Sequence, residues 1–160
     1  MGRFRTVVDA VAADLVASVQ LPGDFRIIKY AHPLPGMMVP DKCPALGVFI
    51  VRYPRRIIAT PGTYEWDLDM QICWYESGAA YGETAGATDN DLPGRLLDTM
   101  EAISDHLETY ATSIPGLPQI GLNLPAYGTI ASGETGDNQG MVWRGMQELT
   151  VTGTALRAIQ

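Results

Sequence analysis

The segment YEWDLDMQICWYE, residues 64–76, decides the fold of this chain. Large apolar side chains occupy every second position along it: Trp66, Leu68, Met70, Ile72 and Trp74. Most positions between them are polar, and three of them carry carboxylates. This period of two is typical of a β-strand with one buried face. It also fixes the register of the strand, because a slip of one residue would bury the acids and expose the tryptophans. A strand of this length needs neighbouring strands, so the sequence predicts a sheet built around it.

Two other segments carry the apolar stripe of an amphipathic helix. The stripe of residues 6–19 consists of Val8, Val11, Ala12, Leu15 and Val19. The stripe of residues 92–110 consists of Leu92, Leu96, Met100, Ile103, Leu107 and Tyr110. Asp91 is a suitable N-cap for the second helix, and Pro93 falls in its first turn, where the missing N–H is harmless. Both stripes need an apolar surface to pack on, and the predicted sheet supplies one.

The rest of the chain alternates between short strands and loops. Further strands are expected at residues 25–30, 45–53, 120–130 (with an irregularity at Pro125) and 141–152. Long loops rich in proline, glycine or small polar residues are expected at residues 31–44, 77–90 and 131–140. The sequence therefore predicts one α+β domain over residues 1–160. In it, an antiparallel or mixed β-sheet of four to five strands has two helices packed on one face.

Charge is distributed unevenly over the 160 residues, whose formal net charge is −7. Residues 1–60 carry a net charge of +4 and residues 61–160 a net charge of −11. Such asymmetry suits a contact between different parts of identical copies, although folding can also scatter these charges over one surface. The acidic total argues against a protein that grips nucleic acid.

Two features bear on the cellular compartment. The longest apolar stretch, residues 7–19, is interrupted by Asp9 and Asp14, so neither an export signal nor a membrane-spanning helix is expected. Synthesis in a cytoplasm follows from this. Cys43 and Cys73 lack the spacing of metal ligands and are expected to be reduced thiols.

No catalytic, cofactor-binding or metal-binding residue is predicted, and the chain is not expected to be an enzyme. Glu65, Asp67 and Asp69 share one strand face, where they are suited to hold a cation or to act as an acid–base pair. Alternating acids opposite an apolar face are also what a solvent-exposed strand carries, and this simpler interpretation is favoured. His32 and His106 are expected at the surface, because neither has a nucleophile at motif spacing. Phosphate-binding and dinucleotide-binding loops are absent from the sequence.

A basic cluster follows the strand expected at residues 45–53. It contains Arg52, Arg55 and Arg56, which are suited to bind an acidic partner surface or to be simply solvated. We take this cluster as a candidate subunit interface. Glu65, Asp67 and Asp69 are the corresponding candidate for an acidic interface or for an acidic face lining a channel.

The order of these elements and their pattern of apolar and polar residues resemble those of the tail terminator, or tail completion, proteins of long-tailed bacteriophages. The resemblance rests on five segments and spans nearly the whole chain: VVDAVAADLVASV, VPDKCPALGVFIV, YEWDLDMQICWYE, LLDTMEAISDHLETY and MQELTVTG. The chain departs from the family pattern in the segment at residues 120–130 and in the glycine-rich stretch at 131–140.

The resemblance implies a structural virion protein without a cofactor. Such a protein forms a homohexameric ring that caps the tail tube, ends tail polymerisation and joins the tail to the head. Its implied partners are other copies of itself, the tail tube protein and a head-completion or connector protein, with no role for a membrane. DNA passes through the lumen without specific binding. The implied location is the head–tail junction of the virion, after synthesis in the host bacterial cytoplasm.

Two other classes of function stay open on the sequence. A different head–tail connector or minor tail protein would share the composition, and its ring stoichiometry and binding partner would distinguish it. A small-molecule enzyme or binding module would need a concave pocket with convergent polar groups and perturbed ionisation. The loops at residues 31–44 and 77–90 are expected to be assembly contacts, because they are long and lack internal packing residues.

Overall fold

A computed structural model describes residues 3–29, 42–52, 57–60, 63–77, 92–111, 114–117, 121–123, 128–134 and 141–156. The first half of the chain forms α1 (Arg3–Ser18), β1 (Arg26–Lys29), β2 (Ala45–Arg52), β3 (Ile57–Thr60) and β4 (Thr63–Ser77). The second half forms α2 (Leu92–Glu108), the 3-10 turn η4 (Thr109–Ala111), β5 (Gly121–Asn123), β6 (Gly128–Glu134) and β7 (Met141–Leu156). The expectation of an α+β fold with a mixed sheet and two helices is confirmed.

The sheet is built around one long antiparallel pair, β4 and β7. All 15 residues of β4 pair with β7, from Thr63 opposite Leu156 to Ser77 opposite Val142. Two short strands share the outer edge of β4, namely β2 and β3, and two share the outer edge of β7, namely β6 and β5. β1 adds in parallel to β2, which makes the sheet mixed. Across its width the strand order is β1-β2-β4-β7-β5.

Three sequence predictions about the strands need correction. The single strand expected at residues 120–130 is two strands, because β5 pairs with β7 at residues 150–152 and β6 pairs with it at residues 141–147. Proline has no N–H to donate to a ladder, which is consistent with a break near Pro125, although residues 124–127 lie outside the described residues. β6 continues to Glu134, into the segment expected as a loop, and β3 is a short strand at a position where no strand was expected.

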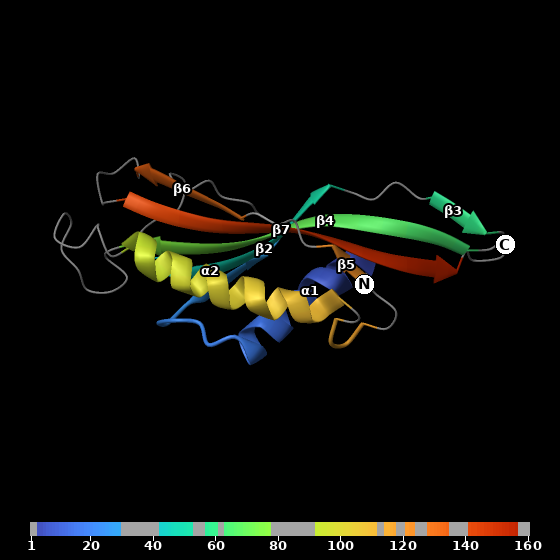
Figure 1. Cartoon of the computed structure of the whole chain (residues 1–160), viewed down its shortest axis with the longest axis horizontal. Helices are drawn as coiled ribbons and strands as arrows, with labels where there is room; N and C mark the ends of the chain where they lie inside the picture. The colour runs from blue at the N-terminus through green and yellow to red at the C-terminus, as the bar shows by residue number, and fades with distance from the viewer. Residues whose placement is uncertain are drawn as a thin grey trace.

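Both helices lie on one face of the sheet, as expected (Figure 1). The apolar side chains of β4 and β7 meet the stripes of α1 and α2 in one core, whose fully buried members include Val11, Leu15, Leu68, Ile72, Leu96, Ile103 and Val151. Phe4 packs edge-on against Trp66, with ring centroids 5.6 Å apart. Figure 1 also shows β4 and β7 extending past both helices beside β3. We refer to the face without helices as the outer face.

Two glycines of β7 make room for large side chains in this core. A Cβ atom on Gly145 would lie 2.3 Å from Met100 Cγ, and one on Gly153 would lie 2.3 Å from Trp66 Cζ2. Both distances are far below van der Waals contact, so Met100 and Trp66 lie directly over the bare backbone of β7. Gly145 thereby lets Met100 bring α2 close to the sheet, and Gly153 makes room for Trp66 of the neighbouring strand β4.

The alternation of β4 does not continue along its whole length. Asp67 is exposed and Asp69 is half-buried, but every residue from Met70 to Ser77 is buried. The outer face there forms a second apolar cluster of Cys43, Ala45, Phe49, Cys73, Tyr75 and Val142. The prediction of only one buried face is therefore wrong for this end of the strand. Burial here depends on the neighbouring strands, which the period of β4 does not report.

The assignment of the faces of β4 is tested by two neighbouring substitutions. Leu68→Ala should lower the free energy of unfolding by about 2–5 kcal/mol, since it empties a fully buried site. Asp67→Ala, at an exposed position on the other face, should change it by no more than about 0.5 kcal/mol. Urea unfolding followed by circular dichroism gives both values. Equal midpoints for the two variants would contradict this assignment.

Candidate functional site

The structure describes the side chains of half of the predicted interface residues. Arg52 ends β2, and Asp67 and Asp69 lie on β4. Arg55 and Arg56 lie outside the described residues, as do most of the loops expected at residues 31–44 and 77–90. The backbone of Glu65 pairs with Thr154 of β7, and its side chain is not described. The register places Asp67 and Asp69 on the outer face of the sheet.

Arg52 and Asp69 are joined to each other within one chain. Arg52 Nε donates to Asp69 Oδ2 at 2.6 Å, and Arg52 Nη2 lies 2.5 Å from the same oxygen. The other carboxylate oxygen of Asp69 accepts a hydrogen bond of 2.8 Å from Thr150 Oγ1. A register shift between Ile50 and Arg52 brings the arginine opposite Asp69. The sequence analysis assigned these two residues to different sides of a subunit contact, and that role stays a prediction.

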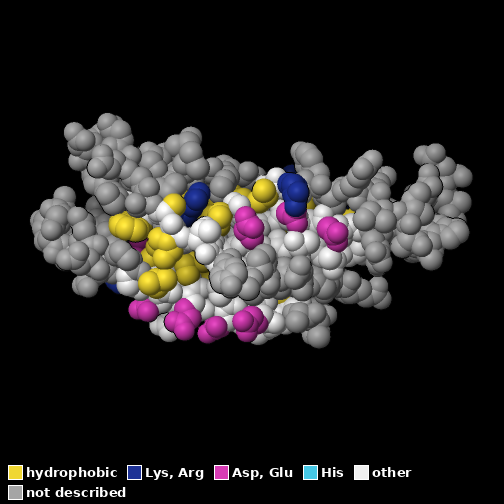
Figure 2. Space-filling view, turned by 45° about the horizontal axis from the view of Figure 1, so that its top comes forward, with side chains coloured by type: hydrophobic (Ala, Val, Ile, Leu, Met, Phe, Trp, Pro, Cys, Tyr) yellow, Lys and Arg dark blue, Asp and Glu magenta, His cyan; other side chains and the backbone are white. Residues whose placement is uncertain are grey.

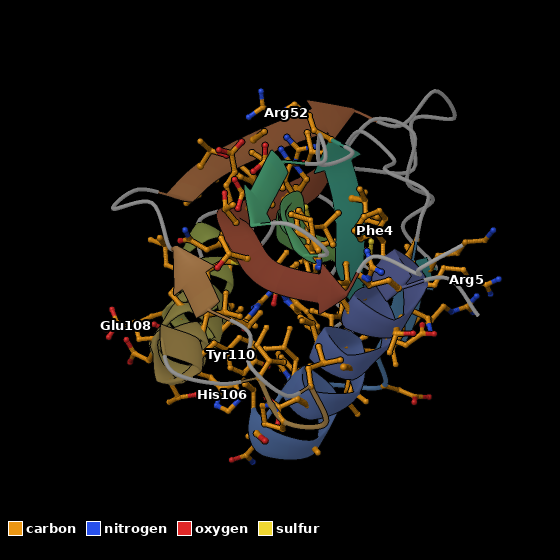
Figure 3. All side chains as sticks on the ribbon, turned by 90° about the vertical axis from the view of Figure 1, so that its right-hand side faces the viewer. Phe4, Arg5, Arg52, His106, Glu108 and Tyr110 are labelled. Carbon is orange, nitrogen blue, oxygen red and sulfur yellow. The ribbon has the colours of Figure 1, made fainter. Side chains whose placement is uncertain are left out.

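The Arg52–Asp69 pair lies in a polar region of the outer face (Figure 3). The Arg52 side chain is 78% exposed, so the pair contributes little to folding stability. Glu148 on β7 is exposed beside it and accepts a hydrogen bond of 3.2 Å from Gln71 Nε2. A shallow hollow of about 320 Å³ lies between β2, β4 and β7 at this point. With the exposed Asp67, the region keeps an excess of carboxylates.

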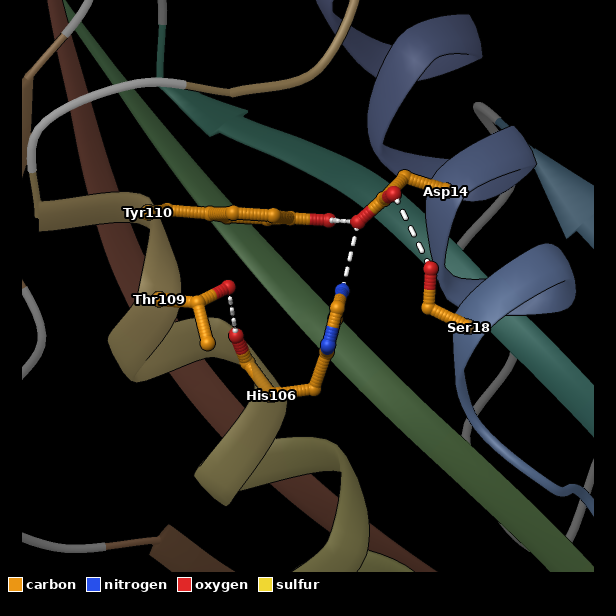
Figure 4. A network of polar contacts seen from close by, with 5 residues as sticks. All are labelled: Asp14, Ser18, His106, Thr109 and Tyr110. Carbon is orange, nitrogen blue, oxygen red and sulfur yellow. Dashed lines mark hydrogen bonds and ion pairs between the residues drawn. The ribbon is translucent and has the colours of Figure 1, made fainter.

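A second polar cluster joins the two helices, and the sequence analysis missed it (Figure 4). His106 Nε2 lies 2.6 Å from Asp14 Oδ2, and the Tyr110 hydroxyl donates to the same oxygen. Ser18 Oγ donates to Asp14 Oδ1 at 3.2 Å. The expectation of His106 at the surface is therefore wrong, since its side chain is only 21% exposed. Asp14 and His106 each directly precede a leucine of a predicted helical stripe. This position in the sequence was the available signal that both side chains lie near the core.

The ionisation of this cluster follows from its contacts. Burial alone would raise the pKa of Asp14, but the hydrogen bonds from Tyr110 and His106 outweigh it and leave that pKa below its ordinary value. Burial, together with the neighbouring Asp14 carboxylate, raises the pKa of Tyr110 far above its usual range. Near neutral pH the carboxylate is therefore charged and the phenol protonated. The cluster is suited to bracing α1 against α2.

Cys43 and Cys73 are free thiols, as expected, and both are buried. Burial raises the pKa of Cys73 to about 12, even though the nearby Arg144 acts in the opposite direction. A thiol with such a pKa is almost entirely protonated at neutral pH and is a poor nucleophile.

Among the described residues, no group of three or more His, Cys, Asp or Glu side chains is arranged to hold a metal ion. Neither α1 nor α2 is long and apolar enough to cross a membrane.

Comparison with protein family models finds no match to this chain, and comparison with curated proteins finds none either.

The bracing role of Asp14 predicts a dependence of stability on pH. Because the pKa of Asp14 is lower in the folded protein than the value of about 3.9 in the unfolded chain, its contribution is full above about pH 4 and is lost as the pH falls further. Asp14→Asn should lower the free energy of unfolding by about 1–3 kcal/mol at pH 7 and by less at pH 3. Urea unfolding over this pH range measures both.

Asp98→Asn, which removes an exposed carboxylate of α2, is the matched control and should follow wild type throughout. A constant difference between Asp14→Asn and wild type from pH 7 to pH 3 would show that Asp14 does not act through its charge.

Proposed function

We propose that this chain is a structural virion protein of the tail-terminator type. It forms a ring that caps the tail tube, ends tail polymerisation, joins the tail to the head and lets DNA pass. The proposal is supported by the family resemblance together with the division of the sheet into a helix-covered face and an outer face. A subunit of a ring around a channel needs an exposed polar surface, and the outer face has one around Arg52, Asp67 and Glu148.

The observation that carries the proposal is the charge of the polar region on the outer face. Arg52 compensates Asp69, whereas Asp67 and Glu148 are exposed acids at the same end of the face. As far as the described residues form it, a channel wall of this kind repels phosphates weakly and offers no array of cations for the DNA backbone to bind. It therefore suits a lumen through which DNA slides.

The proposed partners are those of a ring at the head–tail junction. Copies of this chain contact each other at their sides, the tail tube protein contacts one rim, and a head-completion or connector protein contacts the other. The segments at residues 31–44 and 77–90 are proposed rim contacts. If the ring instead belongs to another connector of the head–tail junction, it should bind the connector but not tail tubes.

The ring and its partner are tested together by analytical ultracentrifugation of the purified protein, alone and mixed with tail tubes of the same phage. A closed species of about six subunits should form on the tube ends, and electron microscopy should show it as a cap. Tubes that stay uncapped while the protein binds the head connector would support the alternative connector function. Binding to neither partner would contradict both.

The position of the outer face is tested by reversing one charge in each subunit. Asp67→Lys should leave ring formation unchanged but place a circle of lysines in the lumen. It should therefore raise the affinity of the ring for duplex DNA by at least about tenfold at low salt. Asp24→Lys makes the same charge change at an exposed position between α1 and β1 and should have a smaller effect. Equal DNA affinity of the two variant rings would place Asp67 outside the lumen.

A further inference from the structure

A groove with exposed apolar walls runs between α2 and β6, away from the polar region of the outer face. Its volume is about 470 Å³, and Leu97, Met100, Ile130 and Met146 contribute to its walls. Leu97 is 52% exposed and Ile130 is 43% exposed. Figure 2 shows hydrophobic side chains gathered on this part of the surface. Large apolar side chains grouped in this way usually mark a contact with another molecule.

The groove has an acidic border. α2 carries four exposed acids, and the only basic side chain of that helix apart from His106 is Arg95. The four acids are Asp98, Glu101, Asp105 and Glu108. Glu101 itself lines the groove, and Figure 2 shows a row of acidic side chains below the apolar patch. We call Leu97, Glu101, Asp105 and Ile130 together the acidic groove.

The opposite edge of the molecule combines an exposed apolar residue with basic side chains. Ile27 of β1 is 46% exposed, and its neighbour Arg26 is also exposed. Lys29, on the same strand, forms an ion pair with Asp9 of α1, and Arg5 projects from the start of that helix. Figure 3 shows Arg5 and Glu108 pointing away from the molecule on opposite sides. We call Arg5, Ile27 and Lys29 the basic edge. Arg26 pairs with Ala45 and therefore faces the outer side of the sheet.

The strand order places these two surfaces where neighbouring copies can meet. β1 is at one end of the order, and β6 pairs with the outer edge of β7 at the other. Ile27 pairs with Leu46 and Ile130 pairs with Gly145, so both isoleucines lie on the helix-covered side of the sheet. When two copies lie edge to edge with their sheets continuous, Ile27 of one approaches Ile130 of the next. Arg5 on α1 then lies on the same side as the acids of α2.

We propose that the basic edge of one copy binds in the acidic groove of the next copy. The inference rests on the proposed ring and identifies the surfaces by which its subunits meet. Because the two surfaces differ and lie on opposite edges, the contact is head to tail and can repeat around a closed ring. The occupant is a second copy because this chain itself carries the matching apolar residue and cations at the required edge. Opposite charges around an apolar centre favour this register over others.

Charge reversal on each surface tests the contact. The basic-edge variant carries Arg5→Glu and Lys29→Glu, and the groove variant carries Glu101→Arg and Asp105→Arg. Each alone should associate at least about tenfold more weakly than wild type, because like charges then face each other. A mixture of the two variants should recover association as alternating assemblies, since every contact again joins opposite charges. Analytical ultracentrifugation measures all of these, and circular dichroism checks that each variant is folded.

The control is Glu148→Arg, which makes the same reversal on the outer face and should associate as wild type does. A second readout uses Ile27→Cys combined with Ile130→Cys. Oxidation should link this variant into a ladder of multimers, whereas either single variant should not form such a ladder. The native thiols of Cys43 and Cys73 are buried and do not compete.

The outcomes separate this contact from the ring itself. Wild-type protein that stays monomeric with and without tail tubes would overturn the ring and, with it, this contact. Wild-type rings that tolerate both charge reversals, or variants whose mixture fails to associate while wild type does, would overturn the contact and leave the ring standing.

Discussion

The paired backbones of β4 and β7 are the constraint on which the rest of this structure depends. Hydrogen bonding along all 15 residues of β4 fixes which side chains of the two strands share a face. The remaining strands then add to the two outer edges of this pair, and the helices cover one of its faces. A shift of one residue would move the apolar residues of β4 to the outer face and leave α1 and α2 without a surface to pack on. The register of one strand pair therefore governs the core and both edges.

The helix layer is held to that pair by two different kinds of contact. Met100 of α2 lies over Gly145 of β7, where any larger residue would push the helix away from the strand. Asp14, His106 and Tyr110 join the two helices through a charged hydrogen-bonded cluster at their contact. The first contact sets how closely the layers approach, and the second sets how α1 and α2 sit relative to each other. Together they define the two edges on which the proposed head-to-tail contact depends.

The uneven charge of the sequence becomes an uneven charge in space through the strand order. α1 and β1 come early in the chain and form one edge of the molecule, whereas the acidic α2 lies toward the opposite edge with β6 and β7. Arg52 lies away from that edge, at the end of β2, where it pairs with Asp69 of the same subunit. Of the described basic residues, Arg52 therefore lies on the outer face, whereas Arg5 and Lys29 lie at the edge formed by α1 and β1. Composition alone does not distinguish these two environments, because it reports the number of charges and not their neighbours.

The sequence by itself determined the helical stripes, the alternation of β4 up to Asp69 and the α+β class, because each of these is a local periodicity. Only the tertiary structure decided that β5 and β6 are separate strands and that β4 is buried on both faces beyond Met70. It also decided that Asp14 contacts His106, although the two residues are 92 positions apart in the chain. Of the candidate interface, the sequence identified Arg52 and Asp69 but not their mutual bond, and it did not identify the acidic groove. These features depend on which distant segments become neighbours. That choice is made by strand pairing and layer packing, which the period of a single segment does not encode.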